Sequence, residues 1–298
     1  MRGQIIDAIF DEMARNEDIF FLTADMGINL VEKFGETYPD RYANVGIAEQ
    51  NLIGVSAGLA NLGYRPFAYT ISNFVVHRCL EQIRNDIGLH HYPITLLGTS
   101  TGYDNSPLGP THHIIDEWGT LQSLPEIDIY CPSSVTYAST LVQTVLQESR
   151  PAYIRIPKGG HQDPASEEHL VHLHGAENGT VLISYGGPAQ SCLQARESQP
   201  EVGLVVVNRL RPLEDEVLVN ALRRYRTAIV VEDHFANSGL YGSLCEFVNR
   251  HQVPIKLDSL APTSYVFDVG TSPEYFARKF GLDPAGILRK VAEISESS

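Results

Sequence analysis

Basic residues are scarce in this chain. Its 298 residues include 22 Lys and Arg against 36 Asp and Glu, which gives a formal net charge of −14. Binding to DNA or RNA needs Lys and Arg clustered against the phosphates, so this balance argues against a nucleic acid as the main partner. We therefore expect no nucleic-acid binding.

Cysteines are also few, and none of them belongs to a C-x-x-C pair. The four are Cys79, Cys131, Cys192 and Cys245. Such wide spacing suggests neither a zinc knuckle nor a disulfide framework, and we expect small core residues. The stretch 169–174 (HLVHLH) alternates His with aliphatic residues. This is typical of a half-exposed strand, and no Cys or carboxylate arrangement there completes a metal-ligand set. We expect no metal ligands in this chain.

Long apolar runs are missing as well. No stretch approaches the ~18 uninterrupted apolar residues that a membrane-spanning helix needs. At the N-terminus, acids such as Asp7 and Asp11 interrupt the apolar positions, so no secretory signal is predicted. We expect a cytoplasmic protein that does not bind membranes.

The apolar residues that are present, 43% of the chain, alternate between strand-like runs and helix-like stretches. Residues 3–15 have the spacing of an amphipathic helix. Strands are predicted at 19–22, 41–45, 66–69, 94–97, 127–130 and 152–156, and then at 181–184, 202–207, 228–232 and 255–259. Helices in the second half are predicted near 189–197, 214–224 and 240–251. The pattern indicates two three-layer α/β domains with mainly parallel sheets, at 1–160 and 179–298, joined by a linker at 161–178 with one short structured stretch.

One acidic residue stands where a strand-like run turns into a helix of small residues. This residue is Glu49, within the segment 44–51 (NVGIAEQN). Taken alone, Glu49 is typical of a first-turn acid favoured by the helix dipole. A strand-to-helix turn can also present a carboxylate to a buried ligand from rigid elements on both sides. In the same helix, the G-x-x-x-G spacing of Gly54 and Gly58 predicts that another backbone packs closely against it, at an interface outside the membrane.

Several motifs in a fixed order resemble the transketolase family of thiamine diphosphate enzymes. They are TADM at 23–26, PDRYANVGIAEQ at 39–50, YTISNF at 69–74, EQIRN at 81–85, GPTH at 109–112 and YIRIPK at 153–158. An ordered set of this kind is a strong signal, whereas a single motif would be weak. The resemblance implies the pyrimidine-binding domain of the family. The motifs LRPL at 210–213 and VEDH at 231–234 resemble its C-terminal domain, which mainly supports assembly.

The resemblance also implies roles for individual residues. Glu49 matches the catalytic carboxyl that hydrogen-bonds N1′ of the cofactor pyrimidine and so favours the imino tautomer that removes the C2 proton. Phe74 matches the aromatic residue that packs on the pyrimidine, and His112 matches a catalytic, substrate-facing His that assists proton movements. The implied cofactor contacts are Asp25, Ile47, Glu49, Ile71, Phe74 and His77, and the implied substrate contacts are Ser100, Leu108, His112 and Lys158.

Some positions depart from relatives that act on sugar phosphates. Such relatives usually have Asp where this chain has Leu108, His where it has Ser100, and Arg near the sugar phosphate where it has Lys158. Ile71 stands where relatives often carry another aromatic residue. The missing Asp would accept a hydrogen bond from a donor hydroxyl, which an apolar side chain cannot do. Leu108 therefore argues against an ordinary ketose phosphate donor and makes pyruvate, or a modified ketose, credible.

The chain also lacks the Gly-Asp-Gly segment and following Asn with which the family holds Mg²⁺ and the diphosphate. Hard cations need such oxygen ligands. By resemblance, we expect a separate diphosphate-binding subunit that supplies the Mg²⁺ ligands. Thiamine diphosphate would then bind between the two chains of a self-associating heterotetramer.

These observations lead to one main hypothesis and two alternatives. The main one is a subunit of a two-component, transketolase-like transferase, active only with its partner. It would move a two-carbon ketol or acetyl unit from a ketose or a 2-oxo acid to an aldehyde or ketone acceptor. The alternatives are the β-type subunit of a 2-oxo acid decarboxylase or dehydrogenase, and a non-catalytic interaction protein that keeps the fold.

Overall fold

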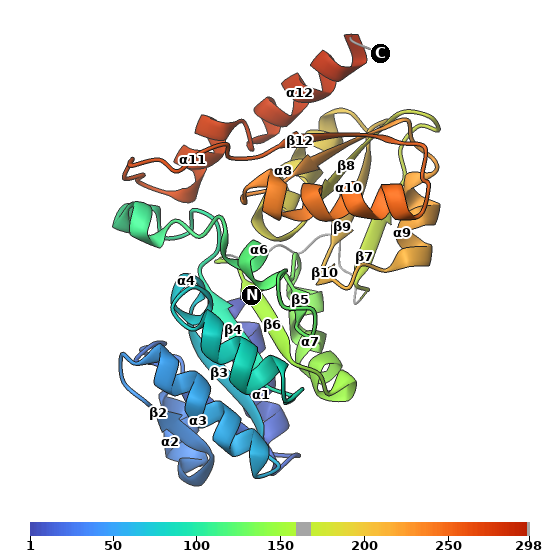
Figure 1. Cartoon of the computed structure of the whole chain (residues 1–298). Helices are drawn as coiled ribbons and strands as arrows, with labels where there is room; N and C mark the ends of the chain where they lie inside the picture. The colour runs from blue at the N-terminus through green and yellow to red at the C-terminus, as the bar shows by residue number, and fades with distance from the viewer. Residues whose placement is uncertain (159–167, 297–298) are drawn as a thin grey trace. The chain divides into compact units, whose positions relative to one another are not determined.

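The computed structural model describes residues 1–158 and 168–296 (Figure 1). Contacts within the chain divide it into two compact units, residues 1–101 with 117–167 and residues 102–116 with 168–298. The domain limits 1–160 and 179–298 stay predictions. The part of the predicted linker 161–178 that precedes residue 168 lies outside the described residues, and from there on the linker contains one short strand, β7 (Leu170–Leu173).

The first unit is built around a sheet whose strands run in the order β5-β6-β4-β3-β1-β2, and every one of these neighbouring pairs is parallel. Its strands are β1 (Ile19–Thr23), β2 (Tyr42–Asn44), β3 (Arg65–Ile71), β4 (Thr95–Thr99), β5 (Asp128–Tyr130) and β6 (Ala152–Ile156). Its α-helices are α1 (Arg2–Met13), α2 (Glu32–Thr37), α3 (Glu49–Asn61), α4 (Ser72–Val76), α5 (Leu80–Gln82), α6 (Glu117–Leu121) and α7 (Val135–Glu148). A π-helix follows α5 at Ile83–Gly88, and a 3₁₀ turn precedes β2 at Pro39–Arg41.

Helices cover the sheet because its central strands are apolar on both faces. All five residues of β4 and all five of β6 are buried. Successive side chains of a strand point to opposite faces, so Phe21 of β1 joins the core under α1 and α7 while Leu22 faces the other side. On that side α3 packs against β3. Near-continuous apolar strands of this kind are typical of a parallel sheet buried between helix layers.

The parallel order brings the ends of five strands to one edge of the sheet. The carboxyl ends of β6, β4, β3, β1 and β2 follow one another along it. In open α/β sheets this edge is where ligands bind. The segments after these strands contain most of the residues that the sequence predicts for the site.

The second unit has its own sheet, in the order β12-β11-β8-β9-β7. The strands after β7 are β8 (Thr180–Ser184), β9 (Gly203–Val207), β10 (Arg209–Arg211), β11 (Thr227–Val231) and β12 (Lys256–Leu260), of which β10 is not part of this sheet. The helices are α8 (Gly186–Ser198), α9 (Asp215–Leu222), α10 (Leu240–Arg250), α11 (Pro273–Phe280) and α12 (Pro284–Glu296), with a 3₁₀ turn at Ala236–Ser238. The pairs β12–β11, β11–β8 and β8–β9 are parallel, which confirms the predicted α/β class.

Residues 102–116 belong to this second unit. An antiparallel bridge between Gly102 and Ile114 closes the segment into a loop, which contains 3₁₀ turns at Ser106–Leu108 and Pro110–His112. Tyr103 stacks on Phe276 of α11 with ring centroids 4.2 Å apart, and His113 meets the same ring edge-on at 4.7 Å. The loop is therefore anchored by its aromatic residues.

Three features of the second unit differ from, or add to, the expectations from the sequence. The strand β7, predicted from the His alternation, is present but pairs antiparallel with β9. Helices α11 and α12 were not predicted. The prediction of a core cysteine is wrong for Cys245, which is exposed. It lies on α10, whose buried residues are Leu240, Leu244 and Phe247, and the helical turn directs Cys245 away from that stripe.

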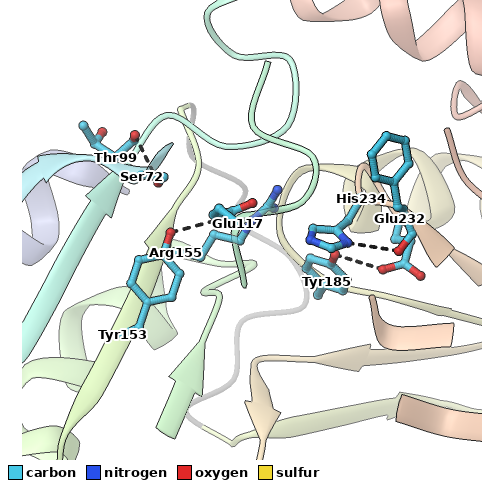
Figure 2. A network of polar contacts seen from close by, with 9 residues as sticks. Ser72, Thr99, Glu117, Tyr153, Arg155, Tyr185, Glu232 and His234 are labelled. Carbon is cyan, nitrogen blue, oxygen red and sulfur yellow. Dashed lines mark hydrogen bonds and ion pairs between the residues drawn. The ribbon is translucent and has the colours of Figure 1, made fainter. Parts of the chain in front are cut away.

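A buried carboxyl fixes the start of α10. Glu232, which follows β11, accepts hydrogen bonds from the backbone N–H groups of Leu240 (2.8 Å) and Tyr241 (3.0 Å) and from the hydroxyl of Tyr185 (3.1 Å), as Figure 2 shows in part. Burial raises the pKa of Glu232 to about 8, although these donors favour the charged form. An added Cβ at Gly239 would lie 2.2 Å from the Glu232 carboxylate, so the glycine leaves room for it.

We expect Glu232→Gln to change how stability depends on pH. The pKa of Glu232 is raised in the folded state. Its contribution to the free energy of unfolding is therefore complete below pH 4.5 and is lost as pH rises through about 8. Between pH 5 and 8 the free energy of unfolding of the wild type should fall, relative to that of the variant, by up to about 1.4 kcal/mol per pH unit. Urea unfolding at several pH values measures this difference. Glu246→Gln, at an exposed position of the same helix, is the control and should follow the wild type. Parallel pH curves for wild type and Glu232→Gln would contradict the prediction.

Within residues 1–158 and 168–296, no helix combines the length and the apolar character needed to cross a membrane.

Candidate active site

The loops after β1 and β2 are joined by one side chain at the edge of the first sheet. The carboxamide oxygen of Asn44 accepts hydrogen bonds from the backbone N–H groups of Asp25 and Gly46, both at 3.0 Å. Asp25 has a positive φ of 51°, and its exposed side chain lies within hydrogen-bonding distance of the Asn44 amide (3.4 Å). Short polar side chains tolerate this left-handed conformation better than most. Asn44 therefore positions both Asp25 and the turn that leads to Glu49.

Glu49 is the first residue of α3, and its side chain is only 3% exposed. Its Oε2 accepts a hydrogen bond from Nη1 of Arg78 at 2.6 Å, which makes a charge-assisted contact. A buried carboxylate at the start of a helix, held by a donor from another element, is not a solvated first-turn acid. The ligand-presenting interpretation of Glu49 stays a prediction.

Phe74 contacts the same guanidinium. It belongs to α4, directly after β3, and the Cζ of Arg78 lies 4.4 Å from the centre of its ring. The guanidinium thus hydrogen-bonds a carboxylate and lies over the face of an aromatic ring. Glu49 and Phe74, which the sequence predicts to bind the same cofactor ring, are brought together around one planar cation.

Arg78 itself lies on the turn between α4 and α5. The Nε2 of Gln50 donates a hydrogen bond to the backbone carbonyl of Arg78 at 3.0 Å. The side chain of Arg78 is 46% exposed. Burial, followed by the negative charge of Glu49, raises the pKa of the neighbouring Cys79 thiol to about 12. Cys79 is therefore an inert thiol beside the site.

The other predicted cofactor residues lie on the same edge of the sheet with different exposures. Ile71 ends β3 and is partly buried, and His77 is exposed next to Arg78. Ile47 is 78% exposed, on the turn between β2 and α3.

The predicted substrate residues fall in both units. Ser100 follows β4, is buried, has a φ of 65° and donates its N–H to the Ile156 carbonyl at 3.1 Å. Lys158 follows β6 and is exposed. In the second unit, Leu108 is 60% exposed, and Nδ1 of His112 lies 3.0 Å from the Thr111 hydroxyl.

A fully buried ion pair lies beneath this edge, at residues for which the sequence predicted no role. Arg155 of β6 and Glu117 of α6 are both 0% exposed, and the Arg155 Nε donates to Oε1 of Glu117 at 2.6 Å. Figure 2 shows the Tyr153 hydroxyl directed at the same carboxylate, at 3.4 Å. Burial, and then the charge of Glu117, raises the pKa of Tyr153 well above its ordinary value. The pair fixes the end of β6, from which Lys158 emerges.

Sequence reasoning missed Arg78 and this buried pair for different reasons. Arg78 has an ordinary surface sequence context, and its partner Glu49 lies 29 positions away. Arg155 could have been flagged, because a charged residue inside an otherwise apolar strand run requires a buried partner.

No metal site is evident in the part of the chain that the structure describes. Within it, no three His, Cys, Asp or Glu side chains are grouped so that they could hold a metal ion.

Comparison with known families matches both units. The transketolase pyrimidine-binding domain matches residues 1–162, and the transketolase C-terminal domain matches residues 171–287. One of the subunits of an apulose-4-phosphate transketolase from Phocaeicola vulgatus is 27% identical over 98% of this chain and 96% of its own length. A 1-deoxy-D-xylulose-5-phosphate synthase of Methylococcus capsulatus is 28% identical over 94% of this chain but only 45% of its own length.

A solved structure resembles the whole chain. It is described as a split gene transketolase, inactive beta4 tetramer, and it superimposes with a TM-score of 0.86 at 25% identity, over 98% of this chain and 97% of the other. The predicted family and fold class are thereby confirmed. The chain belongs to the transketolase family of thiamine diphosphate-dependent transferases, within which it resembles single subunits of two-component enzymes.

Proposed function

We propose that this chain is the pyrimidine-binding subunit of a two-component transketolase. With a diphosphate-binding partner, the enzyme transfers a two-carbon ketol unit from a ketose to an aldehyde or ketone acceptor. The observation that carries the proposal is the pairing of the buried Glu49 carboxylate with the face of Phe74 around one planar group. Nearly full-length similarity to one of the subunits of an apulose-4-phosphate transketolase supports it.

The residues fit thiamine diphosphate because they already hold a group of similar chemistry. A guanidinium and an aminopyrimidine are both flat, both can hydrogen-bond a carboxyl group in their own plane, the pyrimidine through N1′, and both can offer a face to an aromatic ring. When bound, thiamine diphosphate supplies a nucleophilic carbon that attacks the donor carbonyl and carries the two-carbon unit. Glu49 would hold a hydrogen bond at the pyrimidine N1′, and Phe74 would orient the ring. Asp25, Ile47, Ile71 and His77 would complete the pyrimidine pocket.

On the substrate side, His112 would move protons at the donor and acceptor oxygens. An imidazole ring has one nitrogen that can donate a hydrogen bond and one that can accept it. Ser100 and Leu108 would contact the donor, and Lys158 would attract a phosphate or carboxylate group. These roles extend the proposal from cofactor to substrate, and each can be tested by substitution.

A partner subunit and Mg²⁺ are part of the same proposal. The sequence lacks the family's motif for Mg²⁺ and the diphosphate, so another chain would supply these ligands. Both units expose large apolar side chains, including Ile28 (82%) and Ile47 in the first and Phe267 (89%) and Val269 (64%) in the second. Gly54 and Gly58 on α3 have no atom within 4 Å of an added Cβ, so this helix face can take a closely packed neighbour. We propose a heterotetramer in the cytoplasm.

A second candidate is transfer of an acetyl unit from pyruvate. Leu108 favours it, because this side chain cannot accept a hydrogen bond from a donor hydroxyl. The chain is also similar to part of a 1-deoxy-D-xylulose-5-phosphate synthase, which supports keeping this second candidate.

Reconstitution with separate donors tests the proposal. The tagged chain is mixed with a candidate partner that co-purifies with it, Mg²⁺ and thiamine diphosphate. Pyruvate and a ketose phosphate are then offered in separate reactions with an aldehyde acceptor. We expect transfer from the ketose, seen as release of the shortened aldehyde, which would mean that another group replaces the Asp that is missing at Leu108. Carbon dioxide release from pyruvate alone would favour acetyl transfer. Cofactor binding without turnover of any donor would favour a non-catalytic protein.

A further inference from the structure

Arg78 occupies both contacts that the proposed function assigns to the cofactor ring. Its Nη1 lies 2.6 Å from Oε2 of Glu49, and its Cζ lies 4.4 Å from the centre of the Phe74 ring. A carboxylate in the plane and an aromatic ring on the face are the two contacts a pyrimidine would need here. The guanidinium and a bound pyrimidine cannot both make them.

The backbone of Arg78 is fixed while its side chain keeps access to solvent. The Gln50 amide holds the Arg78 carbonyl at 3.0 Å, which ties the turn to α3. The side chain is 46% exposed, whereas that of Glu49 is 3% exposed. The guanidinium can therefore leave toward water by rotation about its own side-chain bonds, without movement of the turn.

Departure of Arg78 without a replacement would be unfavourable. It would leave the buried Glu49 carboxylate without this charge-assisted hydrogen bond. Before the cofactor arrives, the pair thus keeps a buried charge satisfied. A ligand that replaces the guanidinium must itself hydrogen-bond the Glu49 carboxyl group in the plane of its ring, as a pyrimidine would through N1′, which selects rings with such a nitrogen over rings without one.

We propose that the Arg78 guanidinium is an internal substitute for the aminopyrimidine ring of thiamine diphosphate. It closes the Glu49–Phe74 site in the free chain, and the cofactor displaces it on binding. This inference rests on the proposed function and adds to it a residue that competes with the cofactor. Only molecules in which Arg78 has left the site can bind the ring. The apparent affinity is therefore the intrinsic affinity multiplied by the fraction of such molecules.

The test compares ring binding by the full chain with and without this side chain. The probe is 4-amino-5-hydroxymethyl-2-methylpyrimidine, titrated by NMR onto the wild type, Arg78→Ala and Arg78→Met. The methionine variant keeps apolar packing on Phe74 in case the alanine variant is disturbed. Arg84→Ala is the control, because Arg84 is an exposed arginine of the following π-helix whose Nη1 contacts Asn85. The same affinities are measured for thiamine diphosphate in the complex with the partner and Mg²⁺.

We expect Arg78→Ala and Arg78→Met to bind the ring about 3- to 10-fold more tightly than the wild type, and Arg84→Ala to match the wild type. In the wild type, the Arg78 Nε resonance should shift as the probe binds. Methylguanidinium should bind Arg78→Ala and compete with the probe there, but it should not bind the wild type.

Three results would overturn the inference. Weaker binding by both Arg78 variants would make Arg78 a cofactor contact and would leave the proposed function standing. Unchanged binding would mean that Arg78 does not compete. Absence of binding by every variant, for the probe alone and for thiamine diphosphate with the partner, would remove the proposed function together with this inference.

Discussion

Glu49→Gln should lower turnover of the reconstituted enzyme by about 10²- to 10⁴-fold, the range for loss of a positioned acid–base group. Glutamine keeps the shape of the side chain and can still contact Arg78, but it cannot exchange a proton with a pyrimidine nitrogen. Glu49→Ala should remove nearly all activity. Steady-state rates with saturating cofactor and donor measure the effect.

The control for Glu49 is Glu81→Gln. It removes the same charge from an exposed first-turn position of α5 and should leave turnover within about twofold. Thermal unfolding of each variant separates a chemical defect from a folding defect. Near-wild-type turnover of Glu49→Gln, with the cofactor bound, would show that another group activates the cofactor.

Breaking the buried Glu117–Arg155 pair should have the largest effect on stability. Both side chains are 0% exposed and the Nε to Oε1 distance is 2.6 Å. Arg155→Met leaves the Glu117 carboxylate buried without its cation, and we expect a loss of about 3 to 5 kcal/mol in the free energy of unfolding. Urea denaturation measures this loss.

Two further variants test whether uncompensated charge is the cause. The double change Glu117→Leu with Arg155→Met removes both charges and should recover part of the stability. Arg224→Met breaks the pair with Glu177, whose two side chains are 40% and 60% exposed, and should cost about 1 kcal/mol or less. A loss in Arg155→Met no larger than that in Arg224→Met would refute the assigned role of the buried pair.

The sequence allowed the site to be predicted to the level of the strand edge. Asp25, Glu49, Phe74 and Ser100 each follow a strand that the apolar pattern predicts, and parallel pairing brings those strand ends to one edge. The side-chain roles within that edge come from family resemblance and remain proposals. Arg78 was missed because its role depends on two side chains from separate elements.

The C-terminal helices show a different limit. Helix α12 buries Ile287, Val291 and Ile294 at helical spacing, and Pro284 stands at its first position. That signal was present in the sequence, yet the segment was not assigned. The antiparallel direction of β7 carried no such signal, because alternation predicts a strand without indicating its partner.

The sequence by itself determined the family, the two α/β sheets and the strand ends on which the predicted site lies, because apolar periodicity and ordered motifs act locally along the chain. Only the tertiary structure decided that Glu49 pairs with Arg78 over Phe74 and that Arg155 is buried against Glu117. These partners are 29 and 38 positions apart. Burial makes such pairing obligatory for a charge, but the folded chain selects which distant side chain satisfies it.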